Sequence, residues 1–415
     1  MRLAVNFQRV DPSRGGAETY VADLCGSLVR LGHRVDLYAE SWREGVLPAE
    51  VRCIAVEAPG RTRMARTWNF AANSEAALRR ASYDCTIGLI NTWHHDVIIP
   101  QGGVHRASLE YTARRFAPGW RRALYKVGKV ANPRFWTYQA IERRQYDPDR
   151  QARAVAVSNM VRGHLLRYHR IARTRITVIP NAIDADRLQV SQPGAVRCAF
   201  RNRVGLEPDD LVGLFVGHNY WLKGLKPLLT ALARRKGDFP AERPVHLLVS
   251  GAGKAAPILR MARRLGLDGT VHVAGFVPDI RACYWSSDFF VSPTYYDPCS
   301  LAVLEALACG LPAITTACNG AGELMTNGRE GYVIPEPDAL DELAGAIGAM
   351  TDDGARRRMS EHAARLGRSH TFDHHVASLV RVFEEVAATR SHRGPHAAIA
   401  NSTVANLETK GRVTT

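Results

Sequence analysis

The sequence predicts an α/β protein with two domains, each a parallel β-sheet wound with helices. A chain of 415 residues is too long for one ordinary core, which favours two domains. In the first half, short runs rich in β-branched residues alternate with helical segments, as in parallel sheets covered on both faces. After residues 180–194 the same alternation begins again, and this second series predicts a second domain.

The predicted strands are short apolar runs that lack strict polar alternation. In the first half they are 2–7, 33–39, 51–56, 83–90, 96–101, 153–158 and 175–180. In the second half they are 211–217, 245–251, 270–276, 288–293 and 312–317. A helix is predicted between the first two strands, and Gly32 ends it. Open α/β sheets bind ligands at the carboxyl ends of their strands, so we expect the site in a cleft between the domains.

The domain limits are placed where the alternation of predicted strands and helices begins again and where it ends. We expect residues 1–180 to form the first domain, with a C-terminal helix at about 372–389 packed back on it. Residues 181–371 are expected to form the second domain. The segment 390–415 is polar, rich in small residues and aperiodic, and we expect it to be disordered.

Positive charge is concentrated in one part of the chain. The net charge is +15, and residues 106–175 contain 17 Lys or Arg against four Asp or Glu, an excess of 13. Such a field attracts nucleic acid, an anionic membrane or an anionic substrate. A solvated helical face is the other interpretation of the same block.

Cysteine spacing and hydropathy exclude several classes of protein. The eight cysteines show no C-x-x-C spacing, which disfavours a zinc site or a disulfide framework and indicates a reducing cytoplasm. The first residues predict a strand and not a targeting signal. No run approaches the roughly 18–20 apolar residues that span a bilayer.

The segment 295–312, YYDPCSLAVLEALACGLP, is predicted to be a loop that enters a helix directly after a strand. Ser300 is a suitable helix cap, and backbone N–H groups at a helix N-terminus bind phosphate. Asp297 would lie at the helix mouth and Glu305 about two turns inside, where both carboxylates can grip a hydroxyl-rich ligand. Alternatively, Asp297 shapes the turn and Glu305 faces solvent.

Two other segments have the residue types of a phosphate site. In DPSRGGAETYV (11–21), Gly15 and Gly16 let the backbone approach a phosphate at a helix N-terminus, although an ordinary turn has the same composition. The segment lacks G-x-G-x-x-G, which disfavours a dinucleotide oxidoreductase. Lys223 can stabilise charge on a leaving diphosphate, or simply begin a helix.

Four segments of the second half occur in an order that resembles that of one family. They are LFVGHNYWLKGLKPLLTAL, LLVSGAGK, VHVAGFVPDIRACYWSSDFFVSPTYYD and SLAVLEALACGLPAITTACNGAGELMTNGREGYVI. The family that they resemble is the family 4 retaining glycosyltransferases of the GT-B fold, in which two Rossmann-like domains face each other. The resemblance covers roughly residues 2–385 and is strongest over 214–334. The layout is more similar to the lipopolysaccharide core glucosyltransferase I type than to the sucrose or glycogen types.

The resemblance implies that the first domain, residues 1–180, binds the acceptor and that the second, residues 181–371, binds the nucleotide sugar. It also implies roles for individual residues. Glu305 would hold the nucleotide ribose, Asp297 would face the donor sugar, and Lys223 would bind the pyrophosphate. Asp297 is one methylene shorter than the Glu usual in the family. The family's arginine before Lys223 is missing, and Arg175 is the candidate to compensate for it. The other residues implied to contact the donor or the reacting centre are Gly15, Gly16, His105, Phe276, Val277, Ser300 and Leu301.

Several other polar residues have two interpretations. His105 follows a strand and a Gly-Gly pair and is placed to bond a sugar hydroxyl, with His94 and His95 as rivals. The D-x-D patterns at 147–149 and 184–186 are typical of turns, and no metal is expected. In 120–131, Trp120, Leu124, Val127 and Ala131 share one helical face among basic residues. This pattern fits a helix on an anionic leaflet, or one docked on the sheet with a basic outer face.

These observations predict an enzyme that moves a hexose-type sugar from a nucleotide sugar, expected to be UDP-linked, to a lipid-linked or surface glycan such as lipopolysaccharide core. We expect it at the cytoplasmic face of the plasma membrane, without a metal or other cofactor. One alternative is a GT-B sugar-nucleotide epimerase, which needs no acceptor. Another is a nucleic-acid binder that uses the basic block and its interleaved aromatic residues.

Overall fold

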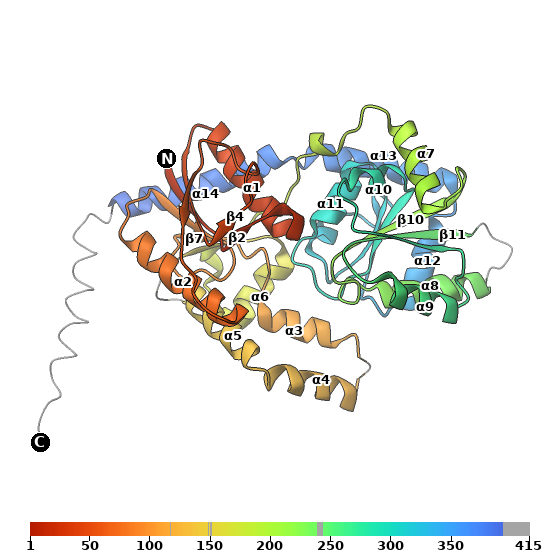
Figure 1. Ribbon diagram of the computed structural model, residues 1–415, viewed down its shortest axis with the longest axis horizontal. Coiled ribbons are helices and arrows are strands. Elements are labelled where there is room, and N and C mark those ends of the chain that lie inside the picture. The colour runs from red at the N-terminus through yellow and green to blue at the C-terminus, as the bar shows by residue number, and fades with distance from the viewer. Residues whose placement is uncertain (117, 148, 150–151, 239–243, 393–415) are drawn as a thin grey trace, which may run out of the picture.

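A computed structural model describes residues 1–392 except 117, 148, 150–151 and 239–243, and it contains two parallel sheets side by side (Figure 1). The first has the order β5 (Arg52–Ala55), β3 (Arg34–Ala39), β1 (Arg2–Asn6), β6 (Cys85–Gly88), β7 (Val97–Ile98), β8 (Arg153–Ala156), β9 (Ile176–Val178). The second has the order β12 (Val271–Gly275), β11 (Val245–Ser250), β10 (Leu211–Val216), β13 (Phe289–Ser292), β14 (Ala313–Thr316), β15 (Gly331–Ile334). The predicted α/β class is confirmed.

Each of the twelve predicted strands overlaps a strand of these sheets. Three strands were not predicted: β15 and the short pair β2 (Arg9–Val10) and β4 (Ser41–Trp42). In β1, the residues from Leu3 to Asn6 are all buried, because helices cover both faces of a parallel sheet. This double coverage explains why the strands are continuous apolar runs.

Helices connect and cover the strands. Those of the first half are α1 (Gly16–Arg30), α2 (Arg63–Arg79), α3 (His105–Ala113), α4 (Trp120–Val130), α5 (Pro133–Gln145) and α6 (Asn159–His169). Those of the second half are α7 (Pro193–Val204), α8 (Leu225–Asp238), α9 (Ala255–Arg264), α10 (Arg281–Trp285), α11 (Leu301–Ala308), α12 (Leu340–Ala349), α13 (Asp353–Ser369) and α14 (Phe372–His392). None of the described helices is long and apolar enough to cross a bilayer.

Helix α14 returns from the second sheet to the first, where it contacts α1 and β6 (Figure 1). The Tyr20 hydroxyl lies 2.8 Å from Nε2 of His375, and Nδ1 of the same ring lies 2.8 Å from the Pro180 carbonyl oxygen. Phe372 packs edge-on against Tyr20. The helix extends three residues into the predicted tail, whose residues 393–415 lie outside the described part of the chain.

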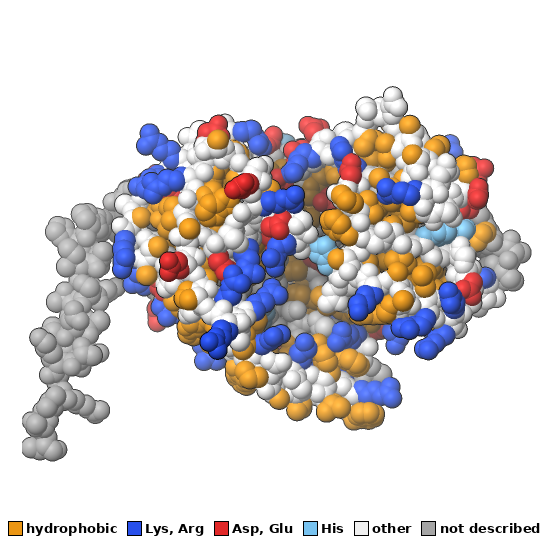
Figure 2. All heavy atoms as spheres, in the orientation of Figure 1, with side chains coloured by type: hydrophobic (Ala, Val, Ile, Leu, Met, Phe, Trp, Pro, Cys, Tyr) orange, Lys and Arg blue, Asp and Glu red, His pale blue; other side chains and the backbone are white. Residues whose placement is uncertain are grey.

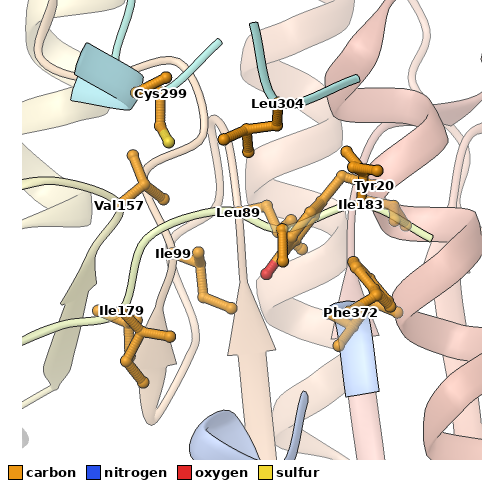
Figure 3. Close-up of a cluster of buried hydrophobic side chains, with 14 of the residues drawn as sticks. Tyr20, Leu89, Ile99, Val157, Ile179, Ile183, Cys299, Leu304 and Phe372 are labelled. Atoms are coloured by element: carbon orange, nitrogen blue, oxygen red, sulfur yellow. The ribbon is translucent and has the colours of Figure 1, made fainter. Parts of the chain in front are cut away.

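One hydrophobic core runs from the first sheet into the second domain. Figure 3 shows Tyr20, Leu89, Ile99 and Val157 of the first half meeting Leu304 of α11. Four further residues complete the labelled cluster: Ile179, Ile183, Cys299 and Phe372. This apolar contact fixes α11 against the first domain, so the cleft walls are held by buried side chains.

Candidate active site

The carboxyl-end loops of both sheets meet directly. The Tyr296 hydroxyl accepts a hydrogen bond of 3.0 Å from the backbone N–H of Val104, across the domain boundary. At the first turn of α6, the Glu323 carboxylate accepts bonds of 2.7 Å from the backbone N–H groups of Asn159 and Met160. A carboxylate at a helix N-terminus is favoured by the helix dipole. These contacts hold the two domains together around the residues described below.

Helix α11 begins where the sequence predicted, directly after β13 and its loop. Ser300 is the N-cap residue, but its side chain makes no capping hydrogen bond. Its backbone N–H instead donates to Oδ1 of Asn319, at 3.2 Å. Asp297 is buried at the helix mouth, and its N–H bonds the Cys318 carbonyl oxygen at 3.0 Å. The loop is therefore fixed by the segment that follows β14.

Lys223 and Asp297 form an ion pair at this mouth. The pair is largely enclosed, since the lysine side chain retains 24% of its exposure and the aspartate 11%. The loops approach closely because Gly224 has φ +82, and a Cβ there would lie 1.9 Å from the Pro293 carbonyl oxygen. The pair places an ammonium beside the α11 N-terminus, which is an arrangement that suits an anion.

Glu305 lies inside α11, as predicted, and is held by a tyrosine. Oε2 accepts a hydrogen bond of 2.6 Å from the hydroxyl of Tyr284 on α10. Burial raises the pKa of the Glu305 carboxyl, and the Tyr284 bond opposes that rise. Oε2 is engaged by the tyrosine, so a bound ligand would be held through Oε1.

The glycine turn before α1 reaches α11. A Cβ at Gly16 would lie 3.1 Å from Cδ1 of Leu301, which shows how closely the two helix starts approach. Leu301 and Glu305 are four residues apart and so share one face of α11. Gly16, Leu301 and Glu305 therefore lie on the same side of α11.

Phe276 and Val277 follow β12 at the carboxyl edge of the second sheet. Phe276 is among the exposed large hydrophobic residues, whereas Val277 is buried in the core. The ring of Phe276 is thus available to contact a ligand at this edge, and Val277 supports the loop from beneath.

His105 begins α3 at the carboxyl edge of the first sheet. Its backbone N–H donates to Oε1 of Glu142 at 2.9 Å, and its ring packs against Tyr138 with centroids 5.2 Å apart. Of the rival histidines, His95 is buried, with Nε2 lying 3.1 Å from the Gln145 carbonyl oxygen. His105 also lines a cavity between the domains.

The structure places Arg175 away from the cleft and so does not support its predicted compensating role. The residue ends a 3₁₀ turn (Arg173–Arg175) directly before β9, whereas the cleft lies at the other end of this strand. There Asn181 bonds the Cys299 carbonyl oxygen of the second domain, at 3.1 Å. Strand β9 and residues 179–180 separate the two positions.

Residues 184–186 form a turn, as predicted, and Asp147 and Asp149, on either side of residue 148, which lies outside the described residues, make the same kind of hydrogen bond. The backbone N–H of Asp149 bonds Oδ1 of Asp147, and that of Asp186 bonds Oδ1 of Asp184, each at 3.1 Å. Among the described residues there is no group of three or more His, Cys, Asp or Glu arranged to hold a metal.

Helix α4 has its apolar face outward, which excludes docking on the sheet with a basic outer face. Trp120 is 70% exposed, and Leu124 and Val127 are each 63% exposed. The helix contacts α3 and α5, and on its opposite face Arg122 and Tyr125 are half-buried, with Nε of Arg122 donating to the Phe116 carbonyl oxygen at 2.8 Å. Figure 2 shows the hydrophobic side chains along the lower edge, over α4.

Three residues that shape the site were not predicted: Tyr284, Tyr296 and Glu323. Tyr284 lies in the segment 271–297, and nothing in the spacing of that segment indicates a contact with Glu305. Tyr296 lies in the predicted loop at 295–300, where the sequence gives no sign of a contact with the other domain. Glu323 follows a Gly-rich turn, and only the fold shows that a helix of the other domain begins opposite to it.

The two sheets and the paired residues at their shared edge define a GT-B glycosyltransferase, and the family comparisons agree. Residues 14–187 match the model described as Glycosyltransferase Family 4, and residues 210–353 match glycosyl transferases group 1. The two models together take in most strands of both sheets. The chain therefore contains a glycosyltransferase family 4 domain and a glycosyl transferases group 1 domain, and it is a glycosyltransferase with the GT-B fold.

Three relatives show the range of similarity. A D-inositol 3-phosphate glycosyltransferase of Catenulispora acidiphila is 32% identical over 257 residues, which cover 58% of this chain and only 59% of the relative. The lipopolysaccharide glucosyltransferase WaaG of Escherichia coli K12 is 23% identical over 350 residues, 84% of this chain and 90% of that protein. A solved structure of WaaG superimposes with a TM-score of 0.76 at 21% identity, over 92% and 99% of the two chains.

The third relative is Anabaena HepE, solved in complex with UDP and glucose. It superimposes with a TM-score of 0.63 at 16% identity, over 94% of this chain and 99% of that chain. At these low identities, the likeness to the solved structures concerns the fold.

Proposed function

We propose that this chain is a retaining glycosyltransferase that moves a hexose-type sugar from UDP to a lipid-linked or surface glycan. The observation that carries the proposal is the Lys223–Asp297 pair at the N-terminus of α11, with Gly16 of the first domain against the same helix. A cation, a helix N-terminus and a glycine turn converge where a diphosphate would lie between the domains.

The residues have distinct roles in this reaction. Lys223 stabilises the negative charge that grows on the diphosphate as the bond from the anomeric carbon to the phosphate oxygen breaks. Asp297 positions Lys223 and faces the donor sugar, and Glu305 holds the ribose through Oε1. The acceptor oxygen bonds to the anomeric carbon on the face that the diphosphate leaves, and its proton passes to the diphosphate oxygen. The protein supplies positioning and electrostatics, without a metal or other cofactor.

The substrates are proposed by similarity. HepE is described in complex with UDP and glucose, and WaaG is described as a lipopolysaccharide glucosyltransferase. We therefore propose UDP-glucose or a related UDP-hexose as the donor, and a glycan such as lipopolysaccharide core as the acceptor. Because the family models and relatives described above are all glycosyltransferases, they give no support to the epimerase or nucleic-acid alternatives.

A thermal-shift comparison of UDP-, GDP- and ADP-sugars tests the donor. Ligand at 100 times its Kd raises the free energy of unfolding by about 2.7 kcal/mol. We expect the UDP-sugar to raise Tm most, and Lys223→Ala to weaken that rise. Adding EDTA should leave turnover unchanged. No shift with any nucleotide sugar at millimolar concentration would contradict the proposal.

We further propose that α4 holds the enzyme at the cytoplasmic face of the plasma membrane. Its outer face presents Trp120, Leu124 and Val127 within the segment that holds nearly all of the excess positive charge. An apolar face flanked by Lys and Arg is typical of a helix that lies in an anionic membrane surface. The opposite, inward face keeps the helix attached to the first domain.

Co-sedimentation with vesicles tests this surface. We expect binding to vesicles with anionic lipid, weakening with salt, and little binding to neutral ones. Leu124→Gln with Val127→Gln should release the protein, and so should Arg121→Gln with Lys126→Gln, at about 1 kcal/mol per charge. Leu31→Gln is the control, because Leu31 directly follows α1 and is 55% exposed, close to the value for Leu124 and Val127. Equal binding to neutral and anionic vesicles would contradict the proposal.

A further inference from the structure

A cavity of about 570 Å³ lies between α3, α4 and α5 of the first domain and a loop of the second domain. Its second-domain wall includes Asn219 and Leu222, and the next residue along the chain is Lys223. The volume is in the range that accommodates a small ligand. A molecule held there would therefore lie beside the residue that we assign to the diphosphate.

The lining of this cavity is cationic. Arg115, Lys129 and Arg134 all line it, and none of its described lining residues is Asp or Glu. This lining gives the cavity a positive potential. The charge is thus directed into the cavity as well as toward the outer surface.

Arg115 is the most constrained of these cations. Its guanidinium lies 4.8 Å from the centre of the Tyr125 ring and 5.0 Å from that of Phe116. Its Nε is buried and makes no hydrogen bond within the described part of the chain. A buried donor without a partner is costly, and an anion in the cavity would add charge-assisted hydrogen bonds from the other N–H groups of the same guanidinium.

The remaining lining suits a saccharide. The rings of His105 and Tyr138 lie 5.2 Å apart at 32°, and both line the cavity. Such rings present flat surfaces to a pyranose, and the lining residues Ser108, Thr112 and Asn132 add hydroxyl and amide groups that can bond its hydroxyls. Pockets of this type combine apolar walls with a few polar groups that fix orientation.

We propose that this cavity is the acceptor subsite and that it takes a saccharide bearing a phosphate or carboxylate group. The inference rests on the proposed function. Arg115, Lys129 and Arg134 bind the anionic group, and the sugar ring lies against His105 and Tyr138. Helix α4 separates two environments, since Lys129 faces the cavity while Leu124 and Val127 face outward. An acceptor saccharide can occupy the cavity while a lipid attached to it stays in the membrane.

Binding of glucose 6-phosphate and of glucose to the full chain tests the proposal. UDP is kept saturating, so that the phosphate is not bound at Lys223. We expect glucose 6-phosphate to bind at least about tenfold more tightly than glucose, as charge-assisted hydrogen bonds imply. Lys129→Gln and Arg134→Gln should remove that preference, each by threefold or more. Arg143→Gln is the matched control, because Arg143 is exposed on the same helix as Arg134 but does not line the cavity.

Each contrary outcome has a distinct meaning. Equal binding of glucose and glucose 6-phosphate, or binding of neither, would overturn the proposal. Loss of the sugar phosphate in Lys223→Ala but not in Lys129→Gln or Arg134→Gln would place it in the donor site. If Lys129→Gln and Arg134→Gln no longer bind vesicles of phosphatidylglycerol but still bind glucose 6-phosphate as the wild type does, the cavity holds a lipid headgroup instead. If the wild-type chain does not bind UDP, the proposed function is contradicted. The glucose 6-phosphate measurement then still decides whether the cavity binds an anionic sugar.

Discussion

Replacing Glu305 separates its role in donor binding from its role in stability. Its carboxylate accepts the Tyr284 hydroxyl through Oε2, so Oε1 is left for a ribose hydroxyl. A hydrogen bond to a charged group contributes about 1.5–3 kcal/mol, which corresponds to about 10- to 150-fold in Kd. Glu305→Ala should therefore weaken UDP binding by at least tenfold. It also strands the buried Tyr284 hydroxyl, at a cost of about 1–3 kcal/mol of stability.

Two further variants resolve these effects. Glu305→Gln keeps an acceptor for Tyr284 but not the charge, so it should lose affinity while retaining most of the stability. Tyr284→Phe should lower the free energy of unfolding and change the UDP affinity less. Calorimetry with UDP and urea unfolding measure the two quantities. Wild-type UDP affinity in Glu305→Ala would refute the assignment of this residue to the donor site.

Three other outcomes are expected. Lys223→Ala should lower kcat more than it raises the donor KM, since the negative charge on the diphosphate grows in the transition state. A normal kcat with a raised KM would show that Lys223 only binds the donor. Burial lowers the pKa of His375 to about 4, below its unfolded value of about 6.5. The unfolded chain therefore binds more protons in this range, and the free energy of unfolding should fall as the pH drops from 6.5 to 4. Urea unfolding of His375→Gln should show a weaker pH dependence, and a pH dependence equal to that of the wild type would exclude His375 as its source. Gly103→Ala should lower the free energy of unfolding by more than about 1 kcal/mol, because Gly103 has φ +69 and a Cβ there would lie 2.2 Å from the Tyr296 hydroxyl. Gly128→Ala lies in open space on α4 and should be neutral or stabilising. Equal changes of Tm in the two variants would contradict this expectation.

The strands could be predicted because burial on both faces leaves a direct mark in the sequence. Continuous apolar runs bounded by Gly and Pro appear at nearly every strand of both sheets. Of the exceptions, β15 begins at a glycine, whereas β2 and β4 have two residues each and lie outside any longer apolar run, unlike the two-residue β7. Such short segments are specified by their neighbours in the sheet, and their own composition is not distinctive.

The site could be predicted only where a residue's place along its own strand or helix decides its position. Asp297 and Glu305 follow β13 and so lie at the carboxyl edge, as the sheet rule requires. The same rule, applied to Arg175, would have placed it at the opposite edge. The position of Glu323 depends on its contact with α6, more than 100 residues away in the sequence. The orientation of α4 depends on its contacts with neighbouring helices. Those contacts have no local signal in one sequence.

The return of α14 to the first sheet has a consequence for how the chain is made. Val376, Leu379 and Phe383 are fully buried against elements formed from the first half of the chain. The first domain is therefore incomplete when its own strands leave the ribosome. At about 5–20 residues per second, the roughly 200 residues that separate β9 from α14 take about 10–40 s to synthesise. During that time its apolar seam is exposed, and a chaperone that binds nascent chains would find its substrate there.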